Sequence, residues 1–138
     1  MGQCQWYAYI ENNIAVALAL RGTYFLNIEL KLHIMVLNII PDEVSDMVAR
    51  DECVIIDVRE PFEYEAGHIE GSILAPMYDI FNDISIVKKY EGKKIVLVCS
   101  SGHRSYYTGK FLEENGIENV YNLYNGLYGW EIEEKPLV

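Results

Sequence analysis

After residue 35 the chain alternates short apolar runs with stretches of helical periodicity, and turn residues separate the two. The runs at residues 53–58 and 94–99 are almost unbroken, which is typical of strands that are covered on both faces. Three further short apolar runs are also predicted to be strands. The predicted strands are residues 35–40, 53–58, 72–75, 94–99 and 120–124.

Helix signals fill the intervals between these runs. Pro41 is followed by two acids, and proline in the first turn with acids near the positive helix end favours a helix start. A short helix is predicted over residues 61–66 and a longer one over 105–115, each closed by a glycine. Parts of 78–90 and residues 127–131 are also expected to be helical. This alternation predicts an α/β fold with a parallel sheet of about five strands and helices on both faces.

The first 34 residues have a different character. Apolar residues occupy every second position from 26 to 34, which predicts a half-buried strand, and residues 8–20 are interpreted as a helix. Residues 1–35 carry two basic and two acidic side chains, so the net charge of -10 belongs to residues 36–138. We expect residues 35–138 to form the domain and residues 1–34 an extension, either loosely attached or an extra helix and strand.

Composition narrows the function classes. With 138 residues, 51% of them hydrophobic, the chain can bury one proper core. Its net charge of -10 argues against nucleic acid or an anionic membrane as partner. No uncharged apolar stretch approaches the ~18 residues that a membrane span needs. The three cysteines lack the pattern of a disulfide scaffold, so a reducing, cytoplasmic setting is expected.

The segment with the strongest chemical signal is CSSGHRS, residues 99–105, between a predicted buried strand and a predicted helix. Ligands of parallel sheets gather at the carboxyl ends of the strands, where Cys99 is expected. A glycine-containing loop at a helix N-terminus can turn several N–H groups toward one point and stabilise a thiolate. Arg104 adds a cation that can grip an oxyanion. Cys99 is therefore the predicted nucleophile.

A second polar segment, Asp57 to Glu60, leaves the other buried strand at the same edge. Arg59 could face the cysteine loop and bind an anion, or form an ordinary surface ion pair. Asp57 is expected to give structural support. Ordinary structural hydrogen bonding is favoured over the alternative that its carboxylate accepts hydrogen bonds from the loop amides. His68 is expected to bond to neighbouring backbone. The predicted substrate-binding residues are Ser100, Ser101, Gly102, His103, Arg104, Ser105 and Arg59.

Neither a metal nor a cofactor is expected. Among the three histidines and three cysteines only Cys99 and His103 lie close in sequence, which is not a four-ligand pattern. His103 either tunes the thiolate or points to solvent. Cys53, inside an apolar run, is interpreted as a small buried hydrophobe.

Four landmarks occur in a fixed order: DVRE at 57–60, GHIEGSI at 67–73, CSSGHRS at 99–105, and NGLYGW at 125–130 with Pro136. Through them residues 36–138 resemble the rhodanese (sulfurtransferase) family. The resemblance implies that Cys99 takes a sulfane sulfur from thiosulfate, a polysulfide or a persulfide and passes it to a thiol or cyanide. It also implies that the amides of residues 100–105 cradle the persulfide and that Arg104 closes the loop. A sulfur-relay protein is a further partner to consider.

Two departures from the family pattern bear on the substrate. Ser100 stands where many members that use thiosulfate have a basic residue, so the donor stays open. Asn125 precedes Gly126 where the family often has two glycines, and asparagine also tolerates a positive φ.

Two other functions remain as alternatives. A cysteine phosphatase or arsenate reductase uses similar parts, but four residues separate Cys99 from Arg104, one fewer than the phosphatase signature has. A non-catalytic binding module of the same family usually lacks the cysteine, which is present here.

Overall fold

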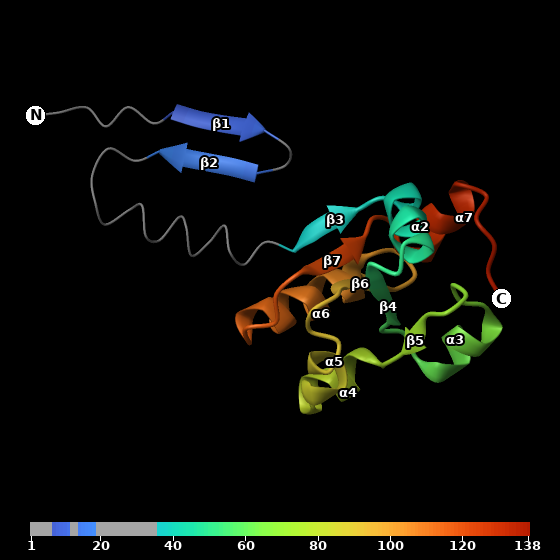
Figure 1. Ribbon diagram of the computed structural model, residues 1–138. Helices are drawn as coiled ribbons and strands as arrows, with labels where there is room; N and C mark the ends of the chain where they lie inside the picture. Colours follow the sequence, from blue (N-terminus) through green and yellow to red (C-terminus); the bar gives the residue numbers. More distant parts are fainter. Residues whose placement is uncertain (1–6, 12–13, 19–35) are drawn as a thin grey trace, which may run out of the picture. The chain divides into compact units, whose positions relative to one another are not determined.

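The computed structural model describes residues 7–11, 14–18 and 36–138 (Figure 1). The chain divides into two compact units, Met1–Met35 and Val36–Val138, and each is described by itself. Among the described residues, no helix combines the length and apolar character that crossing a membrane requires.

The described part of the first unit is an antiparallel hairpin of β1 (Tyr7–Glu11) and β2 (Ile14–Leu18). The helix predicted across residues 8–20 is therefore wrong at these positions. Ile14, Val16 and Leu18 recur with a period of two, and β-branched and aromatic residues favour strands, so local β-propensity prevails. The strand predicted over residues 26–34 lies outside the described residues.

The second unit is built on a five-stranded sheet, and every pairing in it is parallel. The order across the sheet is β3-β7-β6-β4-β5. These strands are β3 (Leu37–Ile39), β4 (Cys53–Asp57), β5 (Ile73–Leu74), β6 (Lys94–Val98) and β7 (Val120–Leu123). The predicted parallel α/β sheet of about five strands is confirmed.

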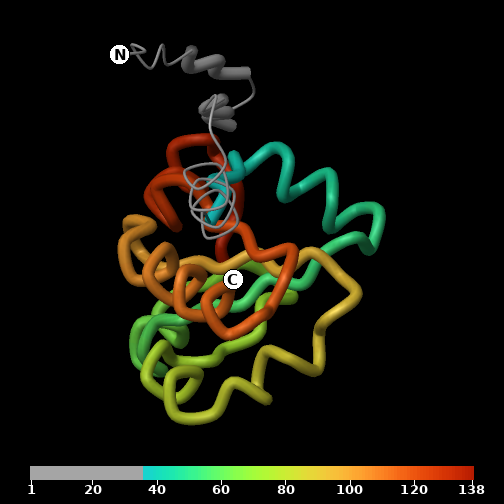
Figure 2. The backbone as a smooth tube through the Cα atoms, turned by 90° about the vertical axis from the view of Figure 1, so that its left-hand side faces the viewer, coloured from blue at the N-terminus to red at the C-terminus, as the bar shows by residue number. Residues whose placement is uncertain are grey.

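Five helices connect the strands of this unit, and a sixth follows the last strand. They are α2 (Pro41–Ala49), α3 (Pro61–Ala66), α4 (Met77–Asn82), α5 (Ser85–Lys88), α6 (His103–Glu114) and α7 (Gly126–Ile132). On one face of the sheet, α2 and α7 contribute Met47 and Trp130 to a buried cluster. On the other face, α4, α5 and α6 contribute Ile80, Val87 and Leu112. The expected helices on both faces are thus present, and Figure 2 lets the reader follow the chain between them.

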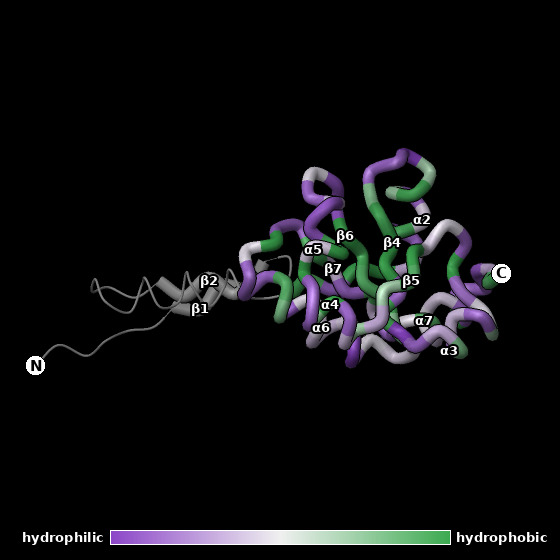
Figure 3. Tube along the Cα trace, turned by 90° about the horizontal axis from the view of Figure 1, so that it is seen from below, coloured by the Kyte–Doolittle hydropathy of each residue, from purple (hydrophilic) through white to green (hydrophobic). Residues whose placement is uncertain are grey.

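The two central strands explain the unbroken apolar runs. In β6, Val96 and Val98 belong to one cluster, whereas Ile95 and Leu97 belong to the opposite one. Since both faces are covered, each position along the strand must be apolar. Figure 3 shows this as the hydrophobic colour concentrated on the strands.

The strand order also brings the polar segments together. Because β6 lies between β7 and β4, the loop that follows β6 is flanked by the segments that follow its two neighbours. The carboxyl ends of all three strands open onto one edge of the parallel sheet.

Candidate active site

Cys99 follows β6 directly and precedes the 12-residue helix α6. The turn between them depends on Gly102, whose φ of 92° lies in the left-handed region. Cys99 itself is buried, with 1% of its surface exposed. The predicted nucleophile therefore lies at the amino end of a helix, where N–H groups are free to bind negative charge.

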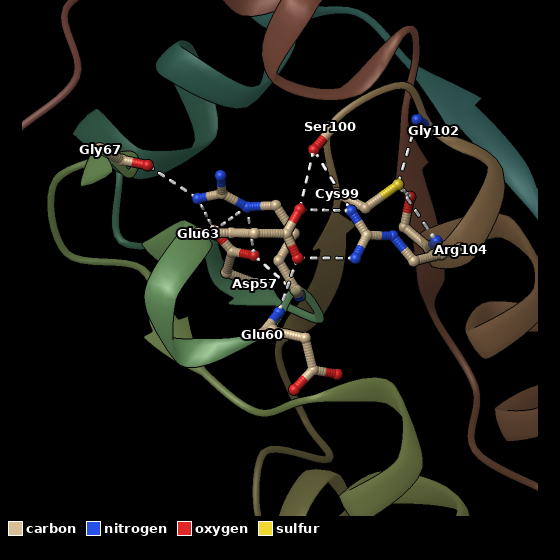
Figure 4. A network of polar contacts seen from close by, with 10 residues as sticks. Asp57, Glu60, Glu63, Gly67, Cys99, Ser100, Gly102 and Arg104 are labelled. Carbon is tan, nitrogen blue, oxygen red and sulfur yellow. Dashed lines mark hydrogen bonds and ion pairs between the residues drawn. The ribbon is translucent and has the colours of Figure 1, made fainter. Parts of the chain in front are cut away.

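Three hydrogen-bond donors converge on the Cys99 sulfur (Figure 4). The N–H of Gly102 lies 3.1 Å from Sγ and that of Ser105 3.5 Å. The hydroxyl of Ser105 lies 3.3 Å away. Such donors stabilise a thiolate, whose negative charge lies on Sγ.

The Ser105 hydroxyl belongs to a longer buried chain of polar groups. Its oxygen lies 2.6 Å from Oδ1 of Asn122 in β7, and the Asn122 amide donates to Oδ1 of Asn38 at 2.9 Å. A hydroxyl has one proton, so Ser105 can donate to Asn122 or to Cys99 but not to both at once. Neither asparagine was among the predicted site residues, although Asn122 interrupts an apolar strand and so carried a signal.

The backbone of the cysteine loop is held by helix α7. The N–H of Leu127 donates to the Cys99 carbonyl at 2.9 Å, and that of Tyr128 to the Ser100 carbonyl at 3.1 Å. Gly126 makes this approach possible, because a Cβ there would collide with the Cys99 carbonyl oxygen. Its φ of 55° also disfavours other residues. The landmark at residues 125–130 therefore supports the loop.

The Arg104 side chain binds a carboxylate of α3. Its guanidinium makes two bonds of 2.8 Å to Glu63, and it lies 3.3 Å from the Ser100 hydroxyl. These hydrogen bonds hold the pKa of Glu63 at about 2, and they raise the pKa of Arg104 above its usual value. Glu63 was not among the predicted site residues, because nothing in its local sequence indicates a partner 41 residues away.

Arg59 and Asp57 form the second arginine–carboxylate pair at this edge. Three bonds of 2.8 to 3.1 Å join the Arg59 side chain to the Asp57 carboxylate, and Arg59 also donates to the Gly67 carbonyl. Both residues are buried, so the alternative of a surface ion pair for Arg59 is wrong. The Asp57 carboxylate accepts hydrogen bonds from the Arg59 guanidinium and from the Arg59 backbone N–H, which is structural hydrogen bonding.

The remaining predicted residues lie around the loop without converging on the sulfur. His103 is exposed, and its Nδ1 lies 3.0 Å from the Ser101 hydroxyl. The His68 ring stacks on Tyr64 and its Nδ1 is 2.9 Å from the Tyr64 carbonyl oxygen. Among the described residues, no three histidine, cysteine or acidic side chains gather as they would around a metal ion.

Cys53 offers a contrast with Cys99. It packs into the core cluster beneath α2, at the opposite end of the strands, and burial raises the pKa of its thiol. Cys53 therefore has the environment of an inert core residue.

A hollow of about 260 Å³ lies beside the loop. Gly102 and His103 form one wall, and Tyr106, Tyr107 and Tyr124 line much of the rest. Its lining offers aromatic and amide groups, without a lysine, an arginine or a carboxylate, next to the cysteine loop.

Comparison with known proteins agrees with this geometry. A model of the rhodanese-like domain matches residues 40–133. A tRNA uridine(34) hydroxylase of Acinetobacter baumannii is 34% identical over 101 residues, which cover 70% of this chain. Those residues cover 32% of the relative, so the chain spans about a third of its length.

Two solved structures share the fold. A rhodanese-related protein from Thermoplasma volcanium has 28% identity and a TM-score of 0.67, and the match covers 74% of this chain and 97% of that one. A thiosulfate sulfurtransferase from Pseudomonas aeruginosa also has 28% identity, with a TM-score of 0.68, over 80% of this chain and 21% of that one.

Proposed function

Because this chain belongs to the rhodanese-like domain family, we propose that it is a sulfurtransferase that carries a sulfane sulfur on Cys99. The donor is thiosulfate, a polysulfide or a persulfide, and the acceptor is a thiol or cyanide. The observation that carries the proposal is the convergence of the Gly102 and Ser105 donors on Sγ. These donors stabilise the thiolate that attacks the donor and that leaves again when the sulfur is passed on, because in both cases the charge lies on Sγ.

The reaction has two balanced steps. The Cys99 thiolate attacks the outer sulfur of the donor, and the new S–S bond forms as the bond from that sulfur to the donor breaks. The electron pair leaves with the donor, as sulfite from thiosulfate or as a thiolate from a persulfide. The acceptor then attacks the outer sulfur, and Cys99 leaves as a thiolate. Such covalent exchange is ping-pong catalysis.

The protein groups act by holding charge. The N–H groups of Gly102 and Ser105 donate to Sγ, where the charge lies before the sulfur is taken up and after it is passed on, while the α7 amides keep the loop backbone in place. Donors that are already oriented need no reorganisation when the charge moves, which lowers the barrier. A reducing, cytoplasmic setting would keep Cys99 available as a thiol.

The similarity to a tRNA uridine(34) hydroxylase does not imply that this chain acts on tRNA. The shared segment is about a third of that protein, and our chain has a net charge of -10, which opposes a phosphate backbone. We therefore propose small sulfur compounds, or a sulfur-relay protein, rather than nucleic acid or a membrane as partners.

The test is an intact mass after incubation with thiosulfate or polysulfide. We expect the mass of one added sulfur atom, its removal by cyanide, and no adduct in Cys99→Ser. The matched control Cys53→Ser should keep the adduct, because Cys53 lies in the core. No adduct with any donor, together with hydrolysis of an aryl phosphate, would favour a phosphatase. A folded protein with neither activity would favour the binding module.

A further inference from the structure

Both arginines at the active edge are neutralised by carboxylates. Arg59 is bound by Asp57, and Arg104 is bound by Glu63 through two bonds of 2.8 Å. Ser100, next to the nucleophile, adds no charge. The positive groups left to meet a donor anion are therefore the backbone N–H groups at the start of α6.

Glu63 stands closest to the cysteine loop among the carboxylates of these pairs. Its Oε1 lies 3.4 Å from the Ser100 hydroxyl, and the same hydroxyl is 3.3 Å from Arg104 (Figure 4). With a pKa of about 2, Glu63 stays ionised at neutral pH. Its side chain keeps 21% of its surface exposed, so its field reaches the space in front of the loop with only partial screening.

We propose that Glu63 makes the site select donors by charge, favouring monoanionic or neutral sulfane-sulfur donors over dianionic thiosulfate. The proposal rests on the proposed function and specifies its substrate class. A carboxylate that binds Arg104 removes the cation that a sulfonate group would use, and its own charge repels what remains. Because the repulsion scales with the charge of the donor, a dianion experiences it twice as strongly as a monoanion.

Two sulfur donors of different charge separate the electrostatic effect of Glu63 from the sulfur-transfer step itself. Thiosulfate and methanethiosulfonate transfer the same kind of sulfur and release sulfite and methanesulfinate, but they carry two charges and one. The measurement is the second-order rate constant for persulfide formation on Cys99 with each donor, followed by rapid quenching and intact mass. The variants are Glu63→Gln, which removes the charge, and Glu63→Asp, which keeps it.

We expect Glu63→Gln to raise the rate constant for thiosulfate by about tenfold and that for methanethiosulfonate by about threefold, since the smaller factor is the square root of the larger. Glu63→Asp should keep the wild-type ratio of the two rate constants. The matched control is Glu65→Gln, which removes the same charge from the same helix α3 at an exposed position. It should change both rate constants by less than about twofold.

Equal changes for both donors, or no change, in a folded Glu63→Gln protein would overturn the charge selection. So would a Glu63→Asp protein that behaves like Glu63→Gln. Failure of the proposed function is a separate result, because it would leave wild-type Cys99 without a sulfur adduct from either donor.

Discussion

Two neighbouring strands, β4 and β6, end at the same edge of the sheet, and an arginine of an arginine–carboxylate pair follows each of them. The Arg59 side chain, after β4, and that of its partner Asp57 are 7% and 0% exposed. The Arg104 side chain, after β6, and that of its partner Glu63 in α3 are 36% and 21% exposed. The same chemical pair is thus buried at one strand end and accessible at the other.

The difference in burial separates their roles. A buried pair that loses one partner leaves an uncompensated charge, so the first pair fixes the structure of the β4 end and the Gly67 turn. An accessible pair contributes little to stability, and the second pair is the one to which we assign donor selection. The cysteine loop beside it is held instead by backbone bonds from α7.

The largest effect is expected from breaking the buried pair. Arg59→Ala should lower the free energy of unfolding by about 3–5 kcal/mol, because Asp57 would remain buried and unpaired. Urea unfolding followed by circular dichroism measures it. Arg50→Ala, which removes an exposed arginine paired with Glu52, is the control and should cost under about 1 kcal/mol. Similar losses in the two variants would contradict the distinction.

Breaking the backbone support of the loop should come next. Gly126→Ala should cost about 2–3 kcal/mol through its positive φ and the collision with the Cys99 carbonyl, and it should also slow persulfide formation. Urea unfolding measures the loss of stability, and intact mass after rapid quenching measures the rate of persulfide formation. Gly92→Ala has a positive φ of 105° but open space around its Cβ, so it should cost about 1 kcal/mol and leave the chemistry intact. If Gly126→Ala kept both the stability and the rate of the wild type, the backbone bonds from α7 would not be what holds the cysteine loop.

The accessible pair should affect rate more than stability. Arg104→Gln should change the free energy of unfolding by less than about 1 kcal/mol. It should lower the rate constant for persulfide formation from thiosulfate by at least about tenfold, since Glu63 would stand uncompensated. Lys110→Gln, on the same helix and paired with Glu114, should change neither quantity. A large loss of stability in Arg104→Gln would place this pair with the buried one.

The smallest effect is the acid dependence of the accessible pair. The hydrogen bonds from Arg104 hold the folded-state pKa of Glu63 at about 2, below its usual value of 4.5. Its contribution to stability is therefore complete above pH 4.5 and is lost as the pH falls toward 2. Between these pH values, stability should fall less steeply in Glu63→Gln than in the wild type. Thermal unfolding over this range measures it, with Glu65→Gln as control. Parallel curves for Glu63→Gln and the wild type would exclude the linkage.

Sequence patterns predicted most of the second unit because its elements follow local rules. The strand over 94–99 and the helix over 61–66 agree closely with β6 and α3, since unbroken apolar runs and proline–glycine boundaries each permit few structures. The helix expected over 8–20 was wrong where the chain is described, because a run with both apolar content and period-two alternation fits either element.

The sequence by itself determined the loop that brings hydrogen-bond donors to Cys99, the predicted nucleophile. Cys99, Gly102 and Ser105 lie within seven residues, and a strand–loop–helix unit brings them together without distant contacts. Only the tertiary structure decided which partner each charged or polar side chain meets. Glu63 reaches Arg104 across 41 residues and Asn38 reaches Asn122 across 84, since helix α3 and strand β3 arrive there through the order of the sheet. That order fixes the charge of the site, because electrostatic interactions depend on distance in space rather than along the chain.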